Sequence, residues 1–165
     1  MVIVYESKTG FTKKYADILS AKTNLKAFRV KELSKVNKDE EILFLGWMKV
    51  GKIQGLKKLR NYNVKAVCGS GTGRTAEPDN KTVMKRNRIE GIPFFYLRGG
   101  CFPLKQLKGM DKFMLSMFVK MLKGRKEKDE RLEESISVIE NGFDGVKEEN
   151  LGSVLEWLEK GRKNY

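Results

Sequence analysis

Small hydroxylated residues follow the first apolar run of the chain. Residues 7–12 (Ser-Lys-Thr-Gly-Phe-Thr) separate that run, which begins at Val2, from a stretch with helical spacing. The first amides of a helix lack partners within the helix, and the helix dipole places partial positive charge there. Hydroxyl donors beside such amides, with a glycine that admits close backbone approach, are the chemistry of a phosphate or other anion site. The same residues also suit an ordinary strand-to-helix turn capped by a hydroxyl.

The loop at residues 7–12 is not a Walker A loop, because the Gly-x-x-x-x-Gly-Lys-Ser/Thr spacing is missing. Two later stretches that contain glycine lie at the ends of dense apolar runs. They are residues 46–51 (Gly-Trp-Met-Lys-Val-Gly) and 69–73 (Gly-Ser-Gly-Thr-Gly). In a parallel sheet such ends lie at one edge, where ligands bind. Trp47 is equally compatible with the core and with a ligand neighbour.

Composition excludes several kinds of chemistry. The chain has no histidine, which excludes Ser-His and Cys-His nucleophile pairs and His-ligated metals. Cys68 and Cys101 are far apart and form neither a zinc motif nor a disulfide framework, and we interpret Cys68 as a buried core thiol. Chemistry beyond simple acid–base work is better carried by a cofactor, so no catalytic side chain and no metal site are assigned.

The chain is strongly basic, with a formal net charge of +13 and a pI near 9.7. Such a charge attracts nucleic acid, an anionic membrane surface, a carboxylate-bearing substrate or an acidic partner protein. The alternative is charge that serves solubility and is spread over solvated helix faces.

Apolar runs and stretches of helical period alternate along the chain. After the first run, strands are expected at residues 27–30, 42–47, 64–71 and 92–97, and helices at 12–24, 53–62, 79–88, 131–139 and 151–160. This alternation predicts an α/β fold with a doubly wound parallel sheet and helices on both faces. We expect one domain over residues 1–165, with an insert at about 99–128.

The loop at residues 7–12 resembles the phosphate loop of flavodoxins. Ser7, Thr9, Gly10 and Thr12 match its Ser-x-Thr-Gly-x-Thr pattern, and the two later stretches occupy the places where flavodoxins flank the isoalloxazine. The resemblance implies a five-stranded parallel sheet of order 2-1-3-4-5 and FMN as cofactor. The implied cofactor-binding residues are Ser7, Lys8, Thr9, Gly10, Phe11, Thr12, Trp47, Met48, Lys49, Val50, Gly51, Gly69, Ser70, Gly71, Thr72 and Gly73.

The stretch GGCFPLKQLKGMDKFMLSMFVKMLKGRKEK starts at Gly99, after the fifth expected strand. It is similar to the long insert of the flavodoxin-like, menaquinone-dependent protoporphyrinogen oxidases. In those proteins a Gly-rich strand end leads through an aromatic-Pro stretch into a helix rich in Met, Phe and Lys. The resemblance implies oxidation of a porphyrinogen, with electrons passed through FMN to a quinone.

The insert has the pattern of an unusual helix. Apolar residues from Met110 to Leu122 occupy most of the circumference of this helix. Lys112, Ser116 and Lys120 form a narrow polar stripe along it. Its flanks are basic, at Lys105, Lys108, Lys123, Arg125, Lys126 and Lys128. This pattern indicates a helix in an anionic membrane interface or over a large anionic substrate. A core helix or a dimer contact is the alternative. The assigned substrate or membrane contacts are Phe102, Lys105, Lys108, Lys112, Phe113, Met117 and Lys120.

Two other functions stay open. One is a flavodoxin-like electron carrier that docks on an acidic redox partner and has no substrate site. The other is a nucleic-acid-binding domain. The absence of an RNP, zinc-finger or helix-turn-helix signature argues against it.

No signal-peptide pattern is present, and no stretch approaches the ~18 to 20 apolar residues of a membrane span. We therefore expect a cytoplasmic protein. The alternative is a cytoplasmic protein that binds peripherally to the inner face of the cell membrane.

Overall fold

The computed structural model describes residues 1–127 and 129–162. The chain forms two compact units. The sheet unit comprises Met1–Gly99 and the chain from Val146 onward, and the helical unit comprises Gly100–Gly145.

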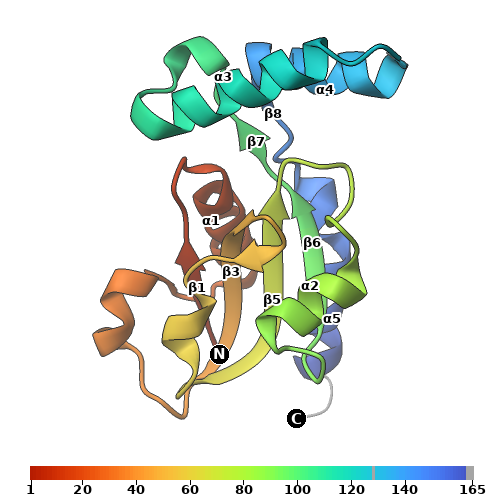
Figure 1. The fold of residues 1–165 in the computed structure, drawn as a ribbon. Helices are drawn as coiled ribbons and strands as arrows, with labels where there is room; N and C mark the ends of the chain where they lie inside the picture. Colours follow the sequence, from red (N-terminus) through yellow and green to blue (C-terminus); the bar gives the residue numbers. More distant parts are fainter. Residues whose placement is uncertain (128, 163–165) are drawn as a thin grey trace. The chain divides into compact units, whose positions relative to one another are not determined.

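The sheet unit contains the predicted parallel sheet (Figure 1). Its strand order is β2-β1-β3-β5-β6, and the short strand β4 pairs antiparallel with the end of β3. Apart from β4, the parallel strands therefore follow the order 2-1-3-4-5 along the chain, which confirms the predicted fold. The strands are β1 (Val2–Glu6), β2 (Ala27–Arg29), β3 (Glu41–Lys49), β4 (Lys52–Ile53), β5 (Asn63–Gly71) and β6 (Phe94–Arg98).

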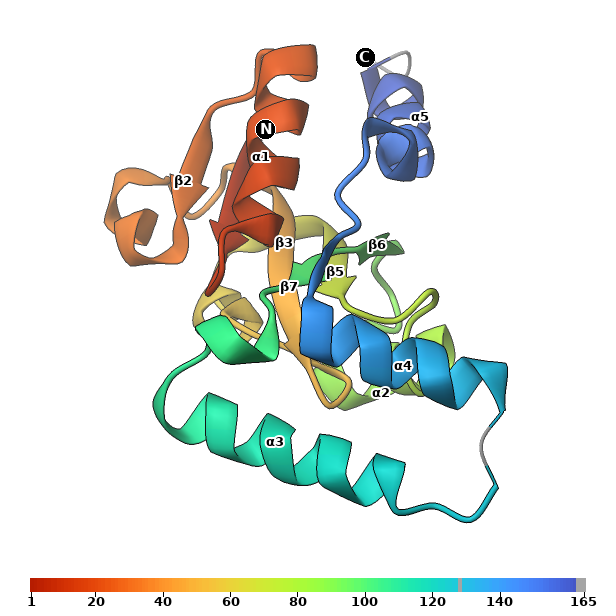
Figure 2. The same cartoon turned by 90° about the horizontal axis from the view of Figure 1, so that it is seen from above.

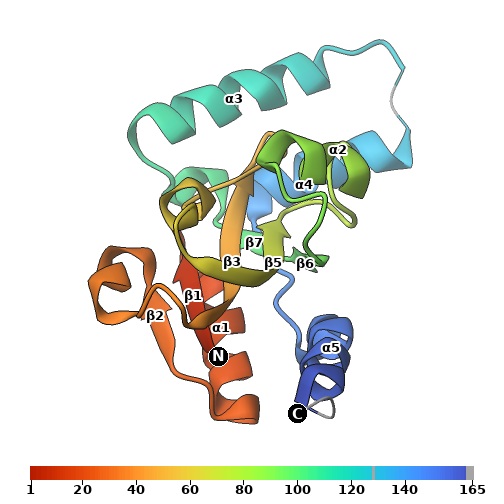
Figure 3. The ribbon, with the colours of Figure 1, turned by 90° about the horizontal axis from the view of Figure 1, so that it is seen from below.

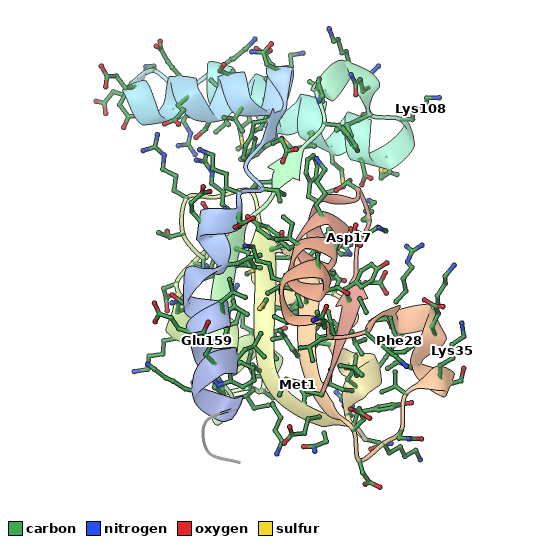
Figure 4. The ribbon with its side chains drawn as sticks, turned by 180° about the vertical axis from the view of Figure 1, so that it is seen from behind. Met1, Asp17, Phe28, Lys35, Lys108 and Glu159 are labelled. Atoms are coloured by element: carbon green, nitrogen blue, oxygen red, sulfur yellow. The ribbon has the colours of Figure 1, made fainter. Side chains whose placement is uncertain are left out.

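Helices cover both faces of the sheet, as predicted (Figures 3 and 4). On one face α1 (Phe11–Thr23) and α5 (Gly152–Arg162) pack on the sheet, and the turn η4 (Glu148–Leu151) leads into α5. On the other face lie α2 (Asn80–Asn87) and the 3-10 turns η1 (Val30–Lys35) and η2 (Leu56–Leu59).

Alternation along each strand supplies the two cores. In β1, Ile3 and Tyr5 face the α1 and α5 side, whereas Val4 faces the other side. Tyr15 of α1 is fully buried, and its hydroxyl donates to the Arg98 carbonyl oxygen at 2.5 Å. The Asn150 side-chain amide donates to the same hydroxyl at 2.5 Å. This network fixes η4, the turn that leads into α5, against α1 and the end of β6.

The helix predicted at residues 53–62 is wrong in extent. Lys52 and Ile53 pair with β3, and only the 3-10 turn η2 follows. Gly55, which precedes η2, has a left-handed backbone with a φ of 85°. A helix from Ile53 cannot pass through this residue, and between it and the start of β5 at Asn63 the chain forms only the single 3-10 turn η2.

The helical unit is an antiparallel pair of helices, α3 (Gly109–Lys123) and α4 (Glu130–Asn141), shown from above in Figure 2. Val119, Leu122 and Ile136 are buried between them, and Lys123 pairs with Glu140 at 2.5 Å. The unit also contains η3 (Leu104–Gln106) and the antiparallel strands β7 (Gly100–Cys101) and β8 (Phe143–Asp144). Lys128 of the predicted basic flank lies outside the described residues.

Candidate functional site

Three loops lie at the carboxyl ends of neighbouring strands. They follow β1, β3 and β5, which are adjacent in the sheet. Two of these ends touch, because the Lys8 Nζ lies 5.6 Å from the centre of the Trp47 ring. A cation over an aromatic face at this distance is attractive. The structure thus brings together residues from the first two loops that the sequence pattern singled out.

The β1–α1 loop is organised by Ser7. Its Oγ accepts hydrogen bonds from the amides of Gly10 at 3.1 Å and Lys13 at 3.3 Å. Gly10 has a φ of 94°, a conformation that favours glycine, and it leads directly into α1. Within the described residues no hydrogen bond reaches the hydroxyl of Thr9, which is exposed, or of Thr12, which is buried. Both hydroxyls therefore stay available to a ligand at the N-terminus of α1.

Arg29 adds a cation to this loop that sequence reasoning missed. Its Nη2 lies 3.5 Å from the Ser7 carbonyl oxygen. The parallel register of β1 and β2 pairs Tyr5 with Arg29, so the guanidinium is placed beside the loop by sheet pairing. Only knowledge of that register could have linked residues so far apart in sequence.

The β3–β4 connection is a tight hairpin. Met48 pairs with Ile53 and Lys49 with Lys52, which leaves a two-residue turn at Val50 and Gly51. Both turn residues have positive φ, 50° and 71°, as a type I′ turn requires. Strand β3 therefore runs two residues beyond its predicted end at Trp47.

Asn87 of α2 holds this hairpin in place. Its Nδ2 donates to the Gly51 carbonyl oxygen, and its Oδ1 accepts from the Ile53 amide, both at 2.9 Å. Val50, which is 83% exposed, is thereby kept in a left-handed conformation that β-branched residues disfavour.

Replacing Val50 with Asn should stabilise the protein. Asn tolerates the left-handed region, whereas Val pays roughly 1 to 2 kcal/mol there. We expect the free energy of unfolding to rise by about 1 kcal/mol, measured by urea denaturation. Val50→Thr keeps the β-branch and should give no gain. A Val50→Asn protein no more stable than Val50→Thr would show that the turn is unstrained.

A cavity of about 510 Å³ lies between this hairpin and the loop after β5. Met48, Val50 and Gly51 line it from the hairpin, and Gly71, Thr72 and Gly73 line it from the end of β5. The remaining lining residues are Glu77, Pro78, Arg86 and Tyr96. The volume lies in the range of cofactor and small-molecule pockets.

The other predicted residues of these stretches lie elsewhere. Trp47 lies under Lys8, and Lys49 is exposed without lining the cavity. Gly69 serves packing, since a Cβ there would lie 2.6 Å from the Met48 sulfur. Ser70 is buried.

Tyr96 supplies an aromatic wall that sequence reasoning missed. Its hydroxyl donates to the Gly73 carbonyl oxygen at 2.8 Å, and its ring leaves no room for a Cβ on Gly71. Burial, with a smaller contribution from the Glu77 carboxylate, raises the pKa of Tyr96, so the phenol stays protonated. The signal in the sequence was the alternation of Phe94 and Tyr96, which places both on one face of β6.

Comparison with known families assigns this architecture. A family model described as a flavodoxin domain matches residues 2–129. The chain belongs to the flavodoxin family. No curated protein matches the chain. Flavodoxin domains typically bind FMN.

The donor set of this flavodoxin-family site fits FMN. The β1–α1 loop offers hydroxyls and helix amides without a carboxylate, as a phosphate requires. The cavity at the carboxyl ends of β3 and β5 presents the Met48 side chain and the Tyr96 ring, which suit a planar aromatic group. In the described ranges no three Cys, Asp or Glu side chains gather closely enough to hold a metal ion. Cys68 is fully buried and burial raises the pKa of its thiol, so it is a neutral core residue.

Proposed function

We propose that this chain binds FMN and works as an oxidoreductase. Ser7, Thr9 and Thr12, with the first amides of α1, would hold the phosphate. Met48 and Tyr96 would bound the flavin ring in the cavity at the carboxyl ends of β3 and β5. The observation that carries the proposal is that a carboxylate-free hydroxyl loop, at the carboxyl end of β1, and a cavity with an aromatic wall, at the carboxyl ends of β3 and β5, share one edge of the sheet. Bound FMN supplies hydride and electron transfer, and the chain supplies binding and orientation.

The finer proposal is an oxidoreductase of the protoporphyrinogen oxidase type, passing electrons to a quinone. Gly100–Gly145 would then be an insert within a single flavodoxin-like domain that spans residues 1–165. Support comes from the insert's sequence pattern and from the positive charge of the chain, which suits propionate groups. The residues assigned to substrate or membrane contact are all exposed: Phe102, Lys105, Lys108, Lys112, Phe113, Met117 and Lys120.

We also propose that α3 lies in the interface of an anionic membrane. Six apolar side chains recur along α3 at helical spacing and are 44% to 69% exposed: Met110, Phe113, Met114, Met117, Phe118 and Met121. Basic residues flank them at both ends of the helix, for example Lys108 and Lys123. An amphipathic helix of this kind binds in the plane of anionic lipid headgroups. None of the described helices is long and apolar enough to cross a bilayer.

The test is an assay of the FMN-loaded protein with protoporphyrinogen and a menaquinone analogue. We expect a yellow protein with one FMN per chain that transfers electrons from the porphyrinogen to the quinone. Reduction by a flavodoxin reductase without porphyrinogen turnover would instead identify an electron carrier that docks on an acidic partner. A colourless protein that fails to take up FMN would overturn both the oxidoreductase and the electron carrier. It would favour the nucleic-acid-binding domain instead.

A further inference from the structure

A second cavity, of about 660 Å³, lies on the α2 face of the sheet unit. Its lining contains basic residues and no acidic one. The basic residues are Lys52, Lys57, Lys58, Arg60, Arg86 and Arg88. The sequence motifs at the carboxyl ends of the strands did not indicate this cavity.

The crossover between β3 and β5 explains why the cavity exists. Parallel neighbours are usually joined by an α-helix that covers the sheet. Here β4 and η2 replace that helix, and η2 and α2 lie on the same face (Figure 3). Apolar side chains line the space that is left, with Ile53, Leu59 and Ile89 buried and Tyr62, Val64 and Ile92 partly buried.

The cations around this cavity are not neutralised by the protein. Within the described residues none of the six forms an ion pair, and the five other than Arg86 show no side-chain hydrogen bond. Arg86 donates to the Val50 carbonyl oxygen at 3.3 Å. Like charges around one concave surface raise the local concentration of anions. Because the floor is apolar, an inorganic anion would leave part of the cavity unused.

We propose that this cavity binds a small amphipathic polyanion. Its apolar or aromatic body would rest on Tyr62, Val64 and Ile92, and its anionic groups would be held by Lys57, Lys58 and Arg88. The site is separate from the FMN site, although Arg86 lines both cavities. The proposal does not depend on FMN binding.

The test uses naphthalene-1,3,6-trisulfonate, an aromatic trianion, with inorganic pyrophosphate as an anion without an apolar body. Binding is measured by calorimetry on protein that carries one equivalent of FMN and no excess, because free FMN is itself an aromatic anion and would compete for the cavity. The site is located by amide chemical shifts in ¹⁵N-labelled protein. We expect the largest shifts at Tyr62, Val64 and Ile92. The aromatic anion should bind about tenfold more tightly than pyrophosphate, because only it uses the apolar floor.

A matched pair of variants separates the site from net charge. Lys57→Glu with Lys58→Glu should weaken binding of the aromatic anion at least tenfold, a loss that close charge reversal readily produces. Lys26→Glu with Lys38→Glu makes the same charge change at exposed residues outside the cavity and should weaken binding less than about twofold. If the first pair unfolds the protein, Lys57→Gln with Lys58→Gln is used instead.

Three results would overturn the proposal. Equal losses in the two pairs would show that net charge alone attracts the anion. Equal affinity for pyrophosphate would show that the apolar floor contributes nothing. Shifts confined to α3 or to the FMN cavity would place the anion elsewhere.

Discussion

Thr9→Val combined with Thr12→Val should weaken FMN binding by roughly 100-fold or more, because each lost hydrogen bond to a charged phosphate is worth about 1.5 to 3 kcal/mol. Valine keeps the shape and β-branch of threonine, so the packing of the buried Thr12 side chain is retained. Riboflavin lacks the phosphate and should bind the variant almost as well as the native protein. Quenching of flavin fluorescence measures both affinities.

The ratio between the two ligands decides what the loop does. Thr23→Val, at the opposite end of α1, makes the same chemical change outside the loop and should leave the ratio unaltered. Arg29→Gln should lower FMN affinity more than riboflavin affinity if the guanidinium near the Ser7 carbonyl acts on the phosphate. If the double valine variant loses affinity for both flavins alike, the hydroxyls only shape the loop.

The parts of the fold that local patterns encode were predictable. Buried strands appear as dense apolar runs, and the hydroxyl loop precedes a helix whose period is clear from Phe11 to Leu19. The hairpin at Val50 was not predictable, because a β-branched residue argues against positive φ. Asn87, far along the chain, imposes the turn through its bonds to Gly51 and Ile53.

The same limit applies to the walls of the candidate site. Tyr96 and Arg29 reach the site from strands whose neighbours are known only after the sheet is assembled. The net charge predicts a basic surface, but it does not predict where on that surface the basic side chains gather. The gathering of Lys57, Lys58 and Arg88 around one cavity follows from a short crossover, which the sequence pattern had assigned to a helix.

Within the helical unit, the structure favours point substitutions over deletion as a test of membrane binding. Removing α3 would expose Leu122's partners on α4, notably Ile136, and would destabilise the unit for reasons unrelated to lipid. Phe113 and Met117 are 62% and 57% exposed, so changing them leaves the contact between α3 and α4 intact.

Phe113→Glu with Met117→Glu should lower partitioning onto anionic liposomes by roughly 100-fold. The two side chains lose about 3 kcal/mol of burial in the interface, and each glutamate is also repelled by anionic lipid. Glutamate keeps helix propensity, so α3 should persist. Gln106→Glu with Ser116→Glu adds the same charge at exposed polar positions and should cost less than tenfold. Sedimentation with liposomes measures both variants.

Salt dependence separates the two contributions to membrane binding. The native protein should lose affinity as ionic strength rises, because Lys108, Lys112 and Lys120 act through screened charges. The residual binding at high salt should depend on the exposed apolar side chains of α3, Phe113 and Met117 among them, since apolar insertion is not screened. Equal partitioning of the apolar and the polar glutamate pairs at every salt concentration would mean that α3 does not insert. Its exposed methionines would then have to meet a protein surface instead, which a concentration-dependent change in oligomeric state would reveal.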